Sequence, residues 1–307
     1  MLDSDFAAQS SGQIARGREG GGDAMRVVRA SHLGMCFGVR GAIAKVLRAA
    51  ARGPLTVLGD LVHNETVLER LAGCGVQVRR EIDEVDTPRV AITAHGVSER
   101  RRAALRARGL TILDATCPIV KAAQRSVKTL ARDGFHPVIV GTPHHVEVRG
   151  LTEDLTAFDV VSSEEDLEAL QPQPRFGVVA QTTQPIERVR HLVSALRCRH
   201  PRSEVQVAET VCIPTRLRQE AAEMLAAACD VTVVVGGAGS NNTRELFATC
   251  RRHCRRVFLV QDARDVRPEW FEGARVAGLT AGTSTPDDVI AGVEAGMRDV
   301  AQRGRRR

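Results

Sequence analysis

Short apolar runs alternate with stretches of helical periodicity along most of this chain. The runs have the length and the β-branched content of buried strands, and they cover residues 27–30, 55–58, 90–93, 110–113, 138–140, 177–180, 205–208, 231–235, 257–260 and 276–279. Between them, apolar positions three and four apart predict helices that include 39–51, 119–131, 186–196, 216–228 and 286–300. This alternation predicts an α/β fold with mostly parallel sheets.

Three cysteines occupy the same place in this pattern. Cys36, Cys117 and Cys212 each follow a predicted strand and directly precede a helix. The start of a helix carries partial positive charge, which favours a thiolate, and Pro118 suits the first helical turn behind Cys117. The cysteines are 81 and 95 residues apart, and their equivalent settings predict a pseudo-threefold site.

The loops behind the cysteines repeat as well. His63, His145 and Ser240 come 27 or 28 residues after their cysteine, past one helix and one strand. A second polar loop follows in each unit, at 94–98, 181–183 and 281–284. Because ligand sites of open α/β sheets lie beyond the carboxyl ends of the strands, three such units predict a closed central cavity.

The repeat divides the chain into three α/β lobes, 26–116, 117–211 and 212–300. Residues 1–25 are rich in Gly, Ser and charge, and we expect a disordered N-terminal extension there, with Met25 as a candidate translation start. Residues 301–307 are expected to form a basic tail.

Composition and charge narrow the class of protein. The formal net charge is +6, but four arginines fall within 303–307 and the others are scattered among acids. Aromatic residues make up only 3% of the chain and tyrosine is missing, so base-stacking surfaces and nucleic-acid binding are not expected. Residues 1–24 contain no apolar run, and no stretch reaches the length of a membrane span. We therefore expect a cytoplasmic protein without a membrane partner, whose eight cysteines are reduced.

Three cysteine ligands without a fourth suit an iron–sulfur cluster that has one open iron, and zinc is the competing metal. The polar loops around the site favour the cluster, because they suit a reacting substrate. The other five cysteines lack this setting: we expect core positions for Cys74, Cys198 and Cys229, and no zinc site at Cys250 and Cys254, which have no second ligand pair.

The polar loops carry donors that suit an anion. These residues are His63, His95, His145, Thr182, Thr183, Ser240, Asn241, Asn242 and Ser284. Helix N-termini together with hydroxyl, amide and imidazole groups form an anion cradle, and Asn242 with Glu245 has capping-box spacing for a helix that begins near Thr243. Glu147, two residues after His145, is the carboxylate that shares the cavity. A thiolate cluster and a phosphate beside it would raise its pKa, which suits a proton donor.

These residues lie in motifs that resemble the 4-hydroxy-3-methylbut-2-enyl diphosphate reductase family over about residues 26–300. The motifs are GMCFGV at 34–39, VHN at 62–64, AHGVS at 94–98, DATCP at 114–118, HVEVRG at 145–150, QTT at 181–183, RQE at 218–220 and TAGTS at 280–284. The resemblance implies a three-lobed trefoil of pseudo-threefold related α/β units around a central iron–sulfur site. The site would be a 4Fe–4S cluster with Cys36, Cys117 and Cys212 as ligands.

The resemblance also implies the chemistry of an oxidoreductase. The family removes the hydroxyl group of an allylic diphosphate with electrons from ferredoxin or flavodoxin, giving isopentenyl and dimethylallyl diphosphates, in isoprene biosynthesis by the methylerythritol phosphate pathway. Glu147 would supply protons, and Thr182 or Thr183 would lie near the substrate hydroxyl. The diphosphate would bind to His63, His95, His145, Ser240, Asn242 and Ser284.

Two stretches depart from the family pattern. Residues 211–215 read VCIPT, where the family usually has Ala-Thr after the cysteine, and 236–242 read GGAGSNN, so Asn241 replaces a serine of the cradle. These departures leave open a divergent paralogue that acts on another allylic diphosphate. The other alternative is a non-catalytic iron–sulfur sensor or electron carrier, which would need neither Glu147 nor the three histidines.

Deleting residues 1–24 is expected to leave folding and activity unchanged. The segment contains no apolar run that could pack against the lobes, and exposed chain termini can usually be removed without harm. Thermal unfolding of the full and shortened chains measures this. A fall in melting temperature of more than a few degrees would show instead that the segment docks on the lobes.

Overall fold

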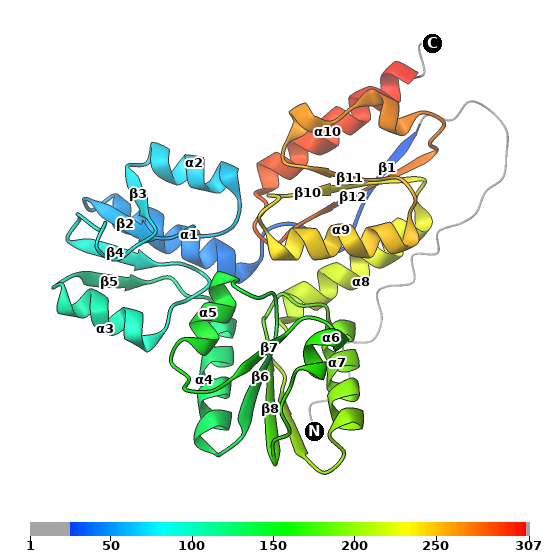
Figure 1. Cartoon of the computed structure of the whole chain (residues 1–307). Helices are drawn as coiled ribbons and strands as arrows, with labels where there is room; N and C mark the ends of the chain where they lie inside the picture. The colour runs from blue at the N-terminus through cyan, green and yellow to red at the C-terminus, as the bar shows by residue number, and fades with distance from the viewer. Residues whose placement is uncertain (1–24, 305–307) are drawn as a thin grey trace, which may run out of the picture.

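The structure, a computed structural model, describes residues 25–304. These residues form three lobes, each built on a four-stranded parallel sheet flanked by helices (Figure 1). The predicted α/β fold with three lobes is confirmed. Residues 1–24 and 305–307, which hold most of the expected extension and part of the expected basic tail, lie outside the described residues. Residues 301–304 of that tail continue the last helix.

The first sheet has the strand order β3-β2-β4-β5 and the second has the order β7-β6-β8-β9. The first lobe contains α1 (Phe37–Ala50), β2 (Leu55–Leu58), α2 (Glu65–Gly73), β3 (Val76–Arg79), β4 (Arg89–Ile92), α3 (Glu99–Ala107) and β5 (Thr111–Asp114). The second contains α4 (Pro118–Arg132), β6 (His136–Val140), α5 (Val146–Thr152), β7 (Asp159–Val161), α6 (Glu164–Glu168), β8 (Arg175–Ala180), α7 (Ile186–Arg199) and β9 (Glu204–Ala208).

The third sheet has the order β1-β12-β10-β11. Its elements are β1 (Arg26–Arg29), α8 (Ile213–Ala228), β10 (Val231–Val235), α9 (Asn241–His253), β11 (Val257–Val260), the 3-10 turns Ala263–Asp265 and Pro268–Phe271, β12 (Val276–Ala281) and α10 (Asp287–Gly304). Every side chain of β10 is buried, which explains its continuous Val-rich sequence. The edge strands β3 and β7 were not predicted, because they are only partly buried and lack a continuous apolar run.

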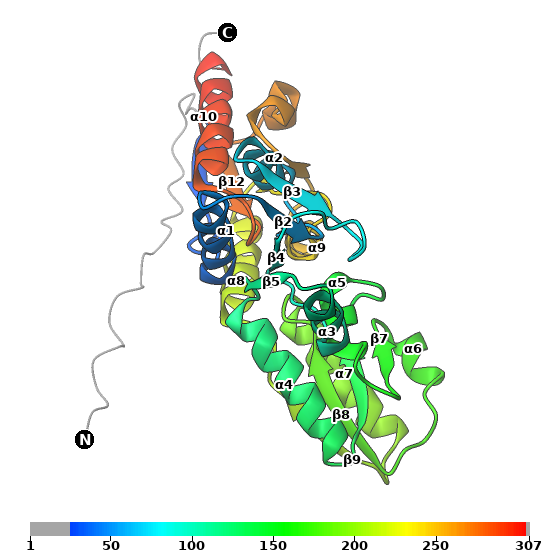
Figure 2. The ribbon, with the colours of Figure 1, turned by 90° about the vertical axis from the view of Figure 1, so that its left-hand side faces the viewer.

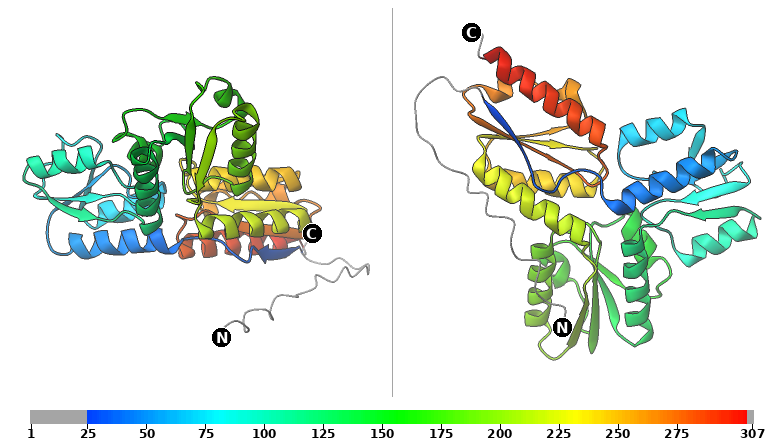
Figure 3. Two further views of the ribbon diagram at one scale, coloured as in Figure 1. Left: turned by 90° about the horizontal axis from the view of Figure 1, so that it is seen from below. Right: turned by 180° about the vertical axis from the view of Figure 1, so that it is seen from behind.

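Strand β1 corrects the expected lobe boundaries. It pairs in parallel with β12, with Arg26 opposite Val276 and Arg29 opposite Leu279, so it belongs to the third sheet and not to a first lobe beginning at residue 26. Figure 3 shows the strand in the third lobe and the chain leading from it into α1. An outer strand of each sheet therefore leads into a cysteine: β1 into Cys36, β5 into Cys117 and β9 into Cys212. The first and last segments of the described chain together complete one lobe.

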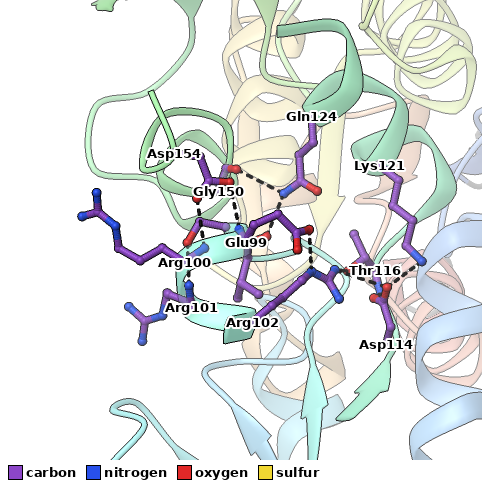
Figure 4. Close-up of polar contacts among 12 residues, drawn as sticks. Glu99, Arg100, Arg101, Arg102, Asp114, Thr116, Lys121, Gln124, Gly150 and Asp154 are labelled. Atoms are coloured by element: carbon purple, nitrogen blue, oxygen red, sulfur yellow. Dashed lines mark hydrogen bonds and ion pairs between the residues drawn. The ribbon is translucent and has the colours of Figure 1, made fainter. Parts of the chain in front are cut away.

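The first and second lobes meet through polar contacts around α3 and α5 (Figure 4). Asp154, just after α5, accepts hydrogen bonds from the backbone N–H groups of Glu99 (2.8 Å) and Arg100 (3.1 Å) at the start of α3. Gln124 Nε2 donates to the carbonyl oxygens of Val97 and Gly150. A carboxylate at a helix N-terminus is favoured by the orphan N–H groups there. These contacts hold α5, and the loop before it, against the first lobe.

Asp114 joins β5 to α4 at the edge of the same region. Its Oδ2 lies 2.6 Å from Lys121 Nζ and 3.2 Å from Arg102 Nη2, and its Oδ1 accepts from the Thr116 N–H at 3.0 Å. Burial alone would raise the pKa of this carboxyl, but the hydrogen bonds from Lys121 and Thr116 and the charge of Arg102 lower it to about 2. The ionised side chain therefore stabilises the turn that leads into Cys117.

Asp114→Asn is expected to lower the free energy of unfolding at pH 7 by about 2 kcal/mol, because lowering a carboxyl pKa from 3.8 to about 2 on folding is worth that much. The lowered pKa means that this stabilisation is present above pH 3.8 and disappears as the pH falls through about 2. Urea denaturation of both proteins at a series of pH values measures it. The control is Asp133→Asn, an exposed carboxyl expected to change stability by less than about 0.5 kcal/mol; equal losses in the two variants would contradict the argument.

Candidate functional site

The carboxyl ends of the strands in all three sheets face one cavity at the centre of the molecule (Figure 1). This cavity is lined by the residues that the sequence predicted to form the site, and each of the three lobes contributes some of them. The lining includes Cys36, His63, His95, Cys117, His145, Glu147, Thr182, Thr183, Cys212, Ser240, Asn241, Asn242 and Ser284.

The three cysteines hold equivalent positions around this cavity. Cys36, Cys117 and Cys212 are the N-cap residues of α1, α4 and α8, and none of their side chains forms a capping hydrogen bond. Figure 2 shows these three helices along the same side of the molecule. The starts of α1 and α4 touch: a Cβ added at Gly38 would lie 2.5 Å from Cys117 Sγ, so only glycine lets the two helices approach. The three helix starts thus bring the three thiols to one cavity.

The three thiols are soft donors that line one cavity, and soft donors suit zinc or an iron–sulfur cluster. Among residues 25–304, no three His, Cys, Asp or Glu side chains are grouped so that they could hold one metal ion. Burial raises the pKa of Cys117, and raises that of Cys212 to about 11, so binding as thiolates would release protons.

The remaining cysteines lie away from the cavity. Cys250 and Cys254 are buried, with their sulfurs against backbone carbonyls, such as Cys254 Sγ 3.3 Å from the oxygen of Arg256. The expectation of core positions was wrong for Cys74 and Cys198, which are exposed, while Cys229 is partly buried. Their helical location alone did not reveal which face they occupy.

Three histidines from two lobes meet at one end of the cavity. The ring centroids of His63 and His95 are 4.4 Å apart, and His145 lies 5.3 and 5.7 Å from them. Burial lowers the pKa of all three rings, that of His145 to about 4. His145 Nδ1 accepts the Glu147 N–H at 3.1 Å, so the neutral ring carries its proton on Nε2. The rings are therefore neutral hydrogen-bond donors in the absence of an anion.

The start of α9 lies beside the histidines. Ser240 caps this helix by accepting the Thr243 N–H at 3.3 Å, so the cap is Ser240 and not Asn242, and the helix begins earlier than predicted. Asn242 Oδ1 accepts the Thr283 N–H at 2.9 Å, while its Nδ2 is buried without a hydrogen-bond partner among the described residues. His95 Nδ1 is also buried without a hydrogen-bond partner among the described residues. Unpaired buried polar atoms are costly, and these two indicate a site for a polar ligand.

Glu147 lines the same cavity from the first turn of α5. Its side chain is 2% exposed, and one carboxylate oxygen accepts the Thr182 N–H at 2.6 Å. Burial raises the pKa of Glu147 to about 7, although the hydrogen bonds from Thr182 act to lower it. The Thr182 carbonyl in turn accepts the Cys212 N–H. A carboxyl that can hold a proton near neutral pH is thus fixed beside the cysteines, as a general acid requires.

The two threonines differ in their contacts. Thr182 is bonded to Glu147, whereas Thr183 Oγ1 accepts hydrogen bonds from the side-chain amides of Gln181 and Asn241. Sequence reasoning also missed Thr215, whose Oγ1 lies 2.9 Å from Cys212 Sγ and which lines the cavity. Its spacing of three residues from the cysteine, within one helical turn, is the signal that could have found it.

The described part of the chain contains no helix with the length and apolar character that crossing a membrane requires.

Comparison with known proteins gives one consistent result. The family model described as "LytB protein" matches residues 27–298. A relative from Geobacter sp. (strain M21), named 4-hydroxy-3-methylbut-2-enyl diphosphate reductase, is 40% identical over 283 residues, which is 90% of this chain and 99% of the relative. A relative of the same name from Aquifex aeolicus (strain VF5) is 36% identical over 284 residues, covering 90% of this chain and 97% of its own.

Solved structures agree with these relatives. The E-1-hydroxy-2-methyl-but-2-enyl-4-diphosphate reductase from Plasmodium falciparum is 25% identical, with a TM-score of 0.83 over 88% of this chain and 86% of its own. A second structure, titled (E)-4-hydroxy-3-methyl-but-2-enyl diphosphate reductase, is 33% identical, with a TM-score of 0.63 over 90% of this chain and 99% of its own. With a family match over most of its length and relatives well above 30% identity, this chain belongs to the LytB family.

Proposed function

We propose that this protein reductively removes the hydroxyl group of 4-hydroxy-3-methylbut-2-enyl diphosphate, giving isopentenyl and dimethylallyl diphosphates. The observation that carries the proposal is the meeting of three cysteines, a buried carboxyl and a cluster of anion donors in one cavity. The relatives carry the name of this reductase, which favours it over another allylic diphosphate. An electron carrier is disfavoured because it needs no buried acid.

The reaction consumes two electrons and two protons: the allylic carbon–oxygen bond breaks, the oxygen leaves as water, and a carbon–hydrogen bond forms. The three cysteines would hold a 4Fe–4S cluster, which when bound supplies electrons from a ferredoxin or flavodoxin and a Lewis-acidic iron for the hydroxyl group. Hydroxide is a poor leaving group, so a proton must reach the oxygen as the bond breaks. This is the role of Glu147, whose carboxyl is protonated in part near neutral pH.

The diphosphate binds beside the histidines. The donors there are the imidazole N–H groups of His63, His95 and His145, the free Nδ2 of Asn242 and the hydroxyl group of Ser240. The Ser284 hydroxyl, which donates to the His63 carbonyl oxygen at 3.2 Å, would turn to the anion. The positive end of α9 adds to their attraction for an anion. A bound diphosphate would also raise the pKa of the three histidines, which burial lowers in its absence.

Cys36→Ser, Cys117→Ser and Cys212→Ser are each expected to lose or badly destabilise the cluster, because a serine hydroxyl is a poor ligand for iron of this type. Protein purified without oxygen should be brown, and its visible absorption and iron content measure the loss. Cys198→Ser and Cys250→Ser are the controls, since these cysteines lie outside the cavity. A bleached Cys250→Ser protein beside a brown Cys36→Ser protein would reject the assignment.

Glu147→Gln is expected to keep the cluster and nearly native substrate affinity while turnover falls at least a hundredfold, because a positioned acid is worth about 10²–10⁴ in rate. Glutamine keeps the size of the side chain and can still accept the Thr182 N–H, but it has no proton to transfer. Anoxic turnover with a reduced dye, together with calorimetric binding, separates rate from affinity.

The matched control is Glu204→Gln, an exposed glutamate on β9 that pairs with Arg175 outside the cavity. It should turn over normally. Near-normal turnover of the Glu147→Gln variant would show that Glu147 is not the proton donor.

A further inference from the structure

Asn241 stands on α9 between two residues of the anion cradle, yet its side chain turns away from them to the second lobe. It is 5% exposed. Its Oδ1 accepts the hydroxyl proton of Thr142 at 3.1 Å, and its Nδ2 donates to Thr183 Oγ1 at 3.1 Å. The oxygen and one N–H of the Asn241 amide are therefore hydrogen-bonded to two separate loops of the second lobe.

A second contact lies one helical turn further along α9. Glu245 forms a two-point ion pair with Arg188 of α7, with nitrogen–oxygen distances of 2.6 and 3.1 Å. Residues four apart lie on the same face of a helix, so Asn241 and Glu245 present one side of α9 to the second lobe. We call the contacts of Thr142, Thr183, Arg188, Asn241 and Glu245 the seam.

The second-lobe side of the seam is itself ordered by side-chain hydrogen bonds. Gln181 Oε1 accepts the Thr142 N–H at 3.0 Å, and Gln181 Nε2 donates to Thr183 Oγ1 at 3.2 Å. Gln184 Oε1 accepts from Arg188 at 2.9 Å. Asn241 thus binds a preformed surface. A serine hydroxyl can also accept and donate, but it does so from one oxygen on a shorter side chain, whereas the amide presents its acceptor and its donor on two separate atoms that reach Thr142 and Thr183.

The seam joins the start of α9 to the loop that holds Glu147. Asn241 lies between Ser240 and Asn242, and its partner Thr183 directly follows Thr182, whose N–H is bonded to Glu147. We propose that Asn241 is a positioning residue, which fixes the distance between the diphosphate donors on α9 and the proton-donating end of the cavity before substrate binds. The proposal rests on the proposed function for the identity of the substrate, and it gives Asn241 a role other than direct diphosphate binding.

Loss of the seam is expected to weaken binding more than catalysis. A bound diphosphate contacts both α9 and the histidines, so it would hold α9 in place even without the seam. Part of the binding free energy would then be used to order α9, and the affinity would fall. Asn241→Ala should raise KM about tenfold, the size expected for losing two neutral hydrogen bonds, with kcat changed less than about threefold. Thr183→Val, which removes one of the two bonds, should raise KM about threefold.

The test is a double-mutant cycle on the cluster-containing protein under anoxic conditions, with 4-hydroxy-3-methylbut-2-enyl diphosphate as the substrate. If Asn241 acts through the seam, adding Thr183→Val to Asn241→Ala changes KM less than twofold further. The matched control is Asn242→Ala, whose effect should multiply with that of Thr183→Val. A multiplicative effect in the Asn241 pair, or no effect of either single variant, would overturn the proposal.

Hydrogen exchange without substrate keeps the two proposals distinguishable. Asn241→Ala should speed exchange at the backbone amides of 181–184 in the second lobe, whereas Asn242→Ala, bonded within its own lobe to Thr283, should not. Asn241→Ser repeats the measurement should the alanine variant fold poorly, with the same expected acceleration. Unchanged exchange in a folded Asn241 variant rejects the seam even if the protein is a reductase, and an inactive wild-type protein with accelerated exchange in the variant rejects only the proposed function.

Discussion

The convergence of three helix N-termini on one cavity constrains the rest of the molecule. Each of α1, α4 and α8 begins at a cysteine that follows an outer strand of a parallel sheet. Because strands in a parallel sheet all end on one side, this arrangement turns the loops of every sheet toward the same cavity. The close approach of Gly38 to Cys117 shows how little room the arrangement leaves. The site is a product of the threefold packing, and no single lobe contains it.

The burial of the titratable groups in this cavity then controls their protons. Within residues 25–304, the side chains that line it include no lysine or arginine, although the charge of Arg244 on α9 helps to lower the pKa of His63 and His145. Burial lowers the pKa of the histidines and raises that of Glu147, and both effects favour neutral groups. An arriving diphosphate therefore meets donors whose charge can respond to it, beside an acid that has kept its proton. A lining rich in arginine would bind the anion more simply, but it would also tend to ionise Glu147.

The sequence revealed most of this site because its signals are local. A cysteine between a strand and a helix, or a histidine at a strand end, can be recognised from a few neighbours, and the threefold recurrence brought Cys36, Cys117 and Cys212 together. What depends on distant partners was not visible. The pairing of β1 with β12 joins residues at opposite ends of the described chain, and β3 and β7 are edge strands with weak patterns. The direction of the Asn241 side chain was equally hidden, because it is set by threonines from another lobe.

The place of β1 has a consequence for how the protein is made. The strand is synthesised long before its partner β12, because Arg26 pairs with Val276 and the first two lobes lie between them in the chain. Until then Arg26–Arg29 has no sheet to join, and the Cys36 N–H lacks its acceptor, the Thr283 carbonyl oxygen. The first two lobes can fold during synthesis, because their strands pair within continuous segments. The third sheet closes only after β12 has been made, so the three-cysteine site is completed later than the first two lobes.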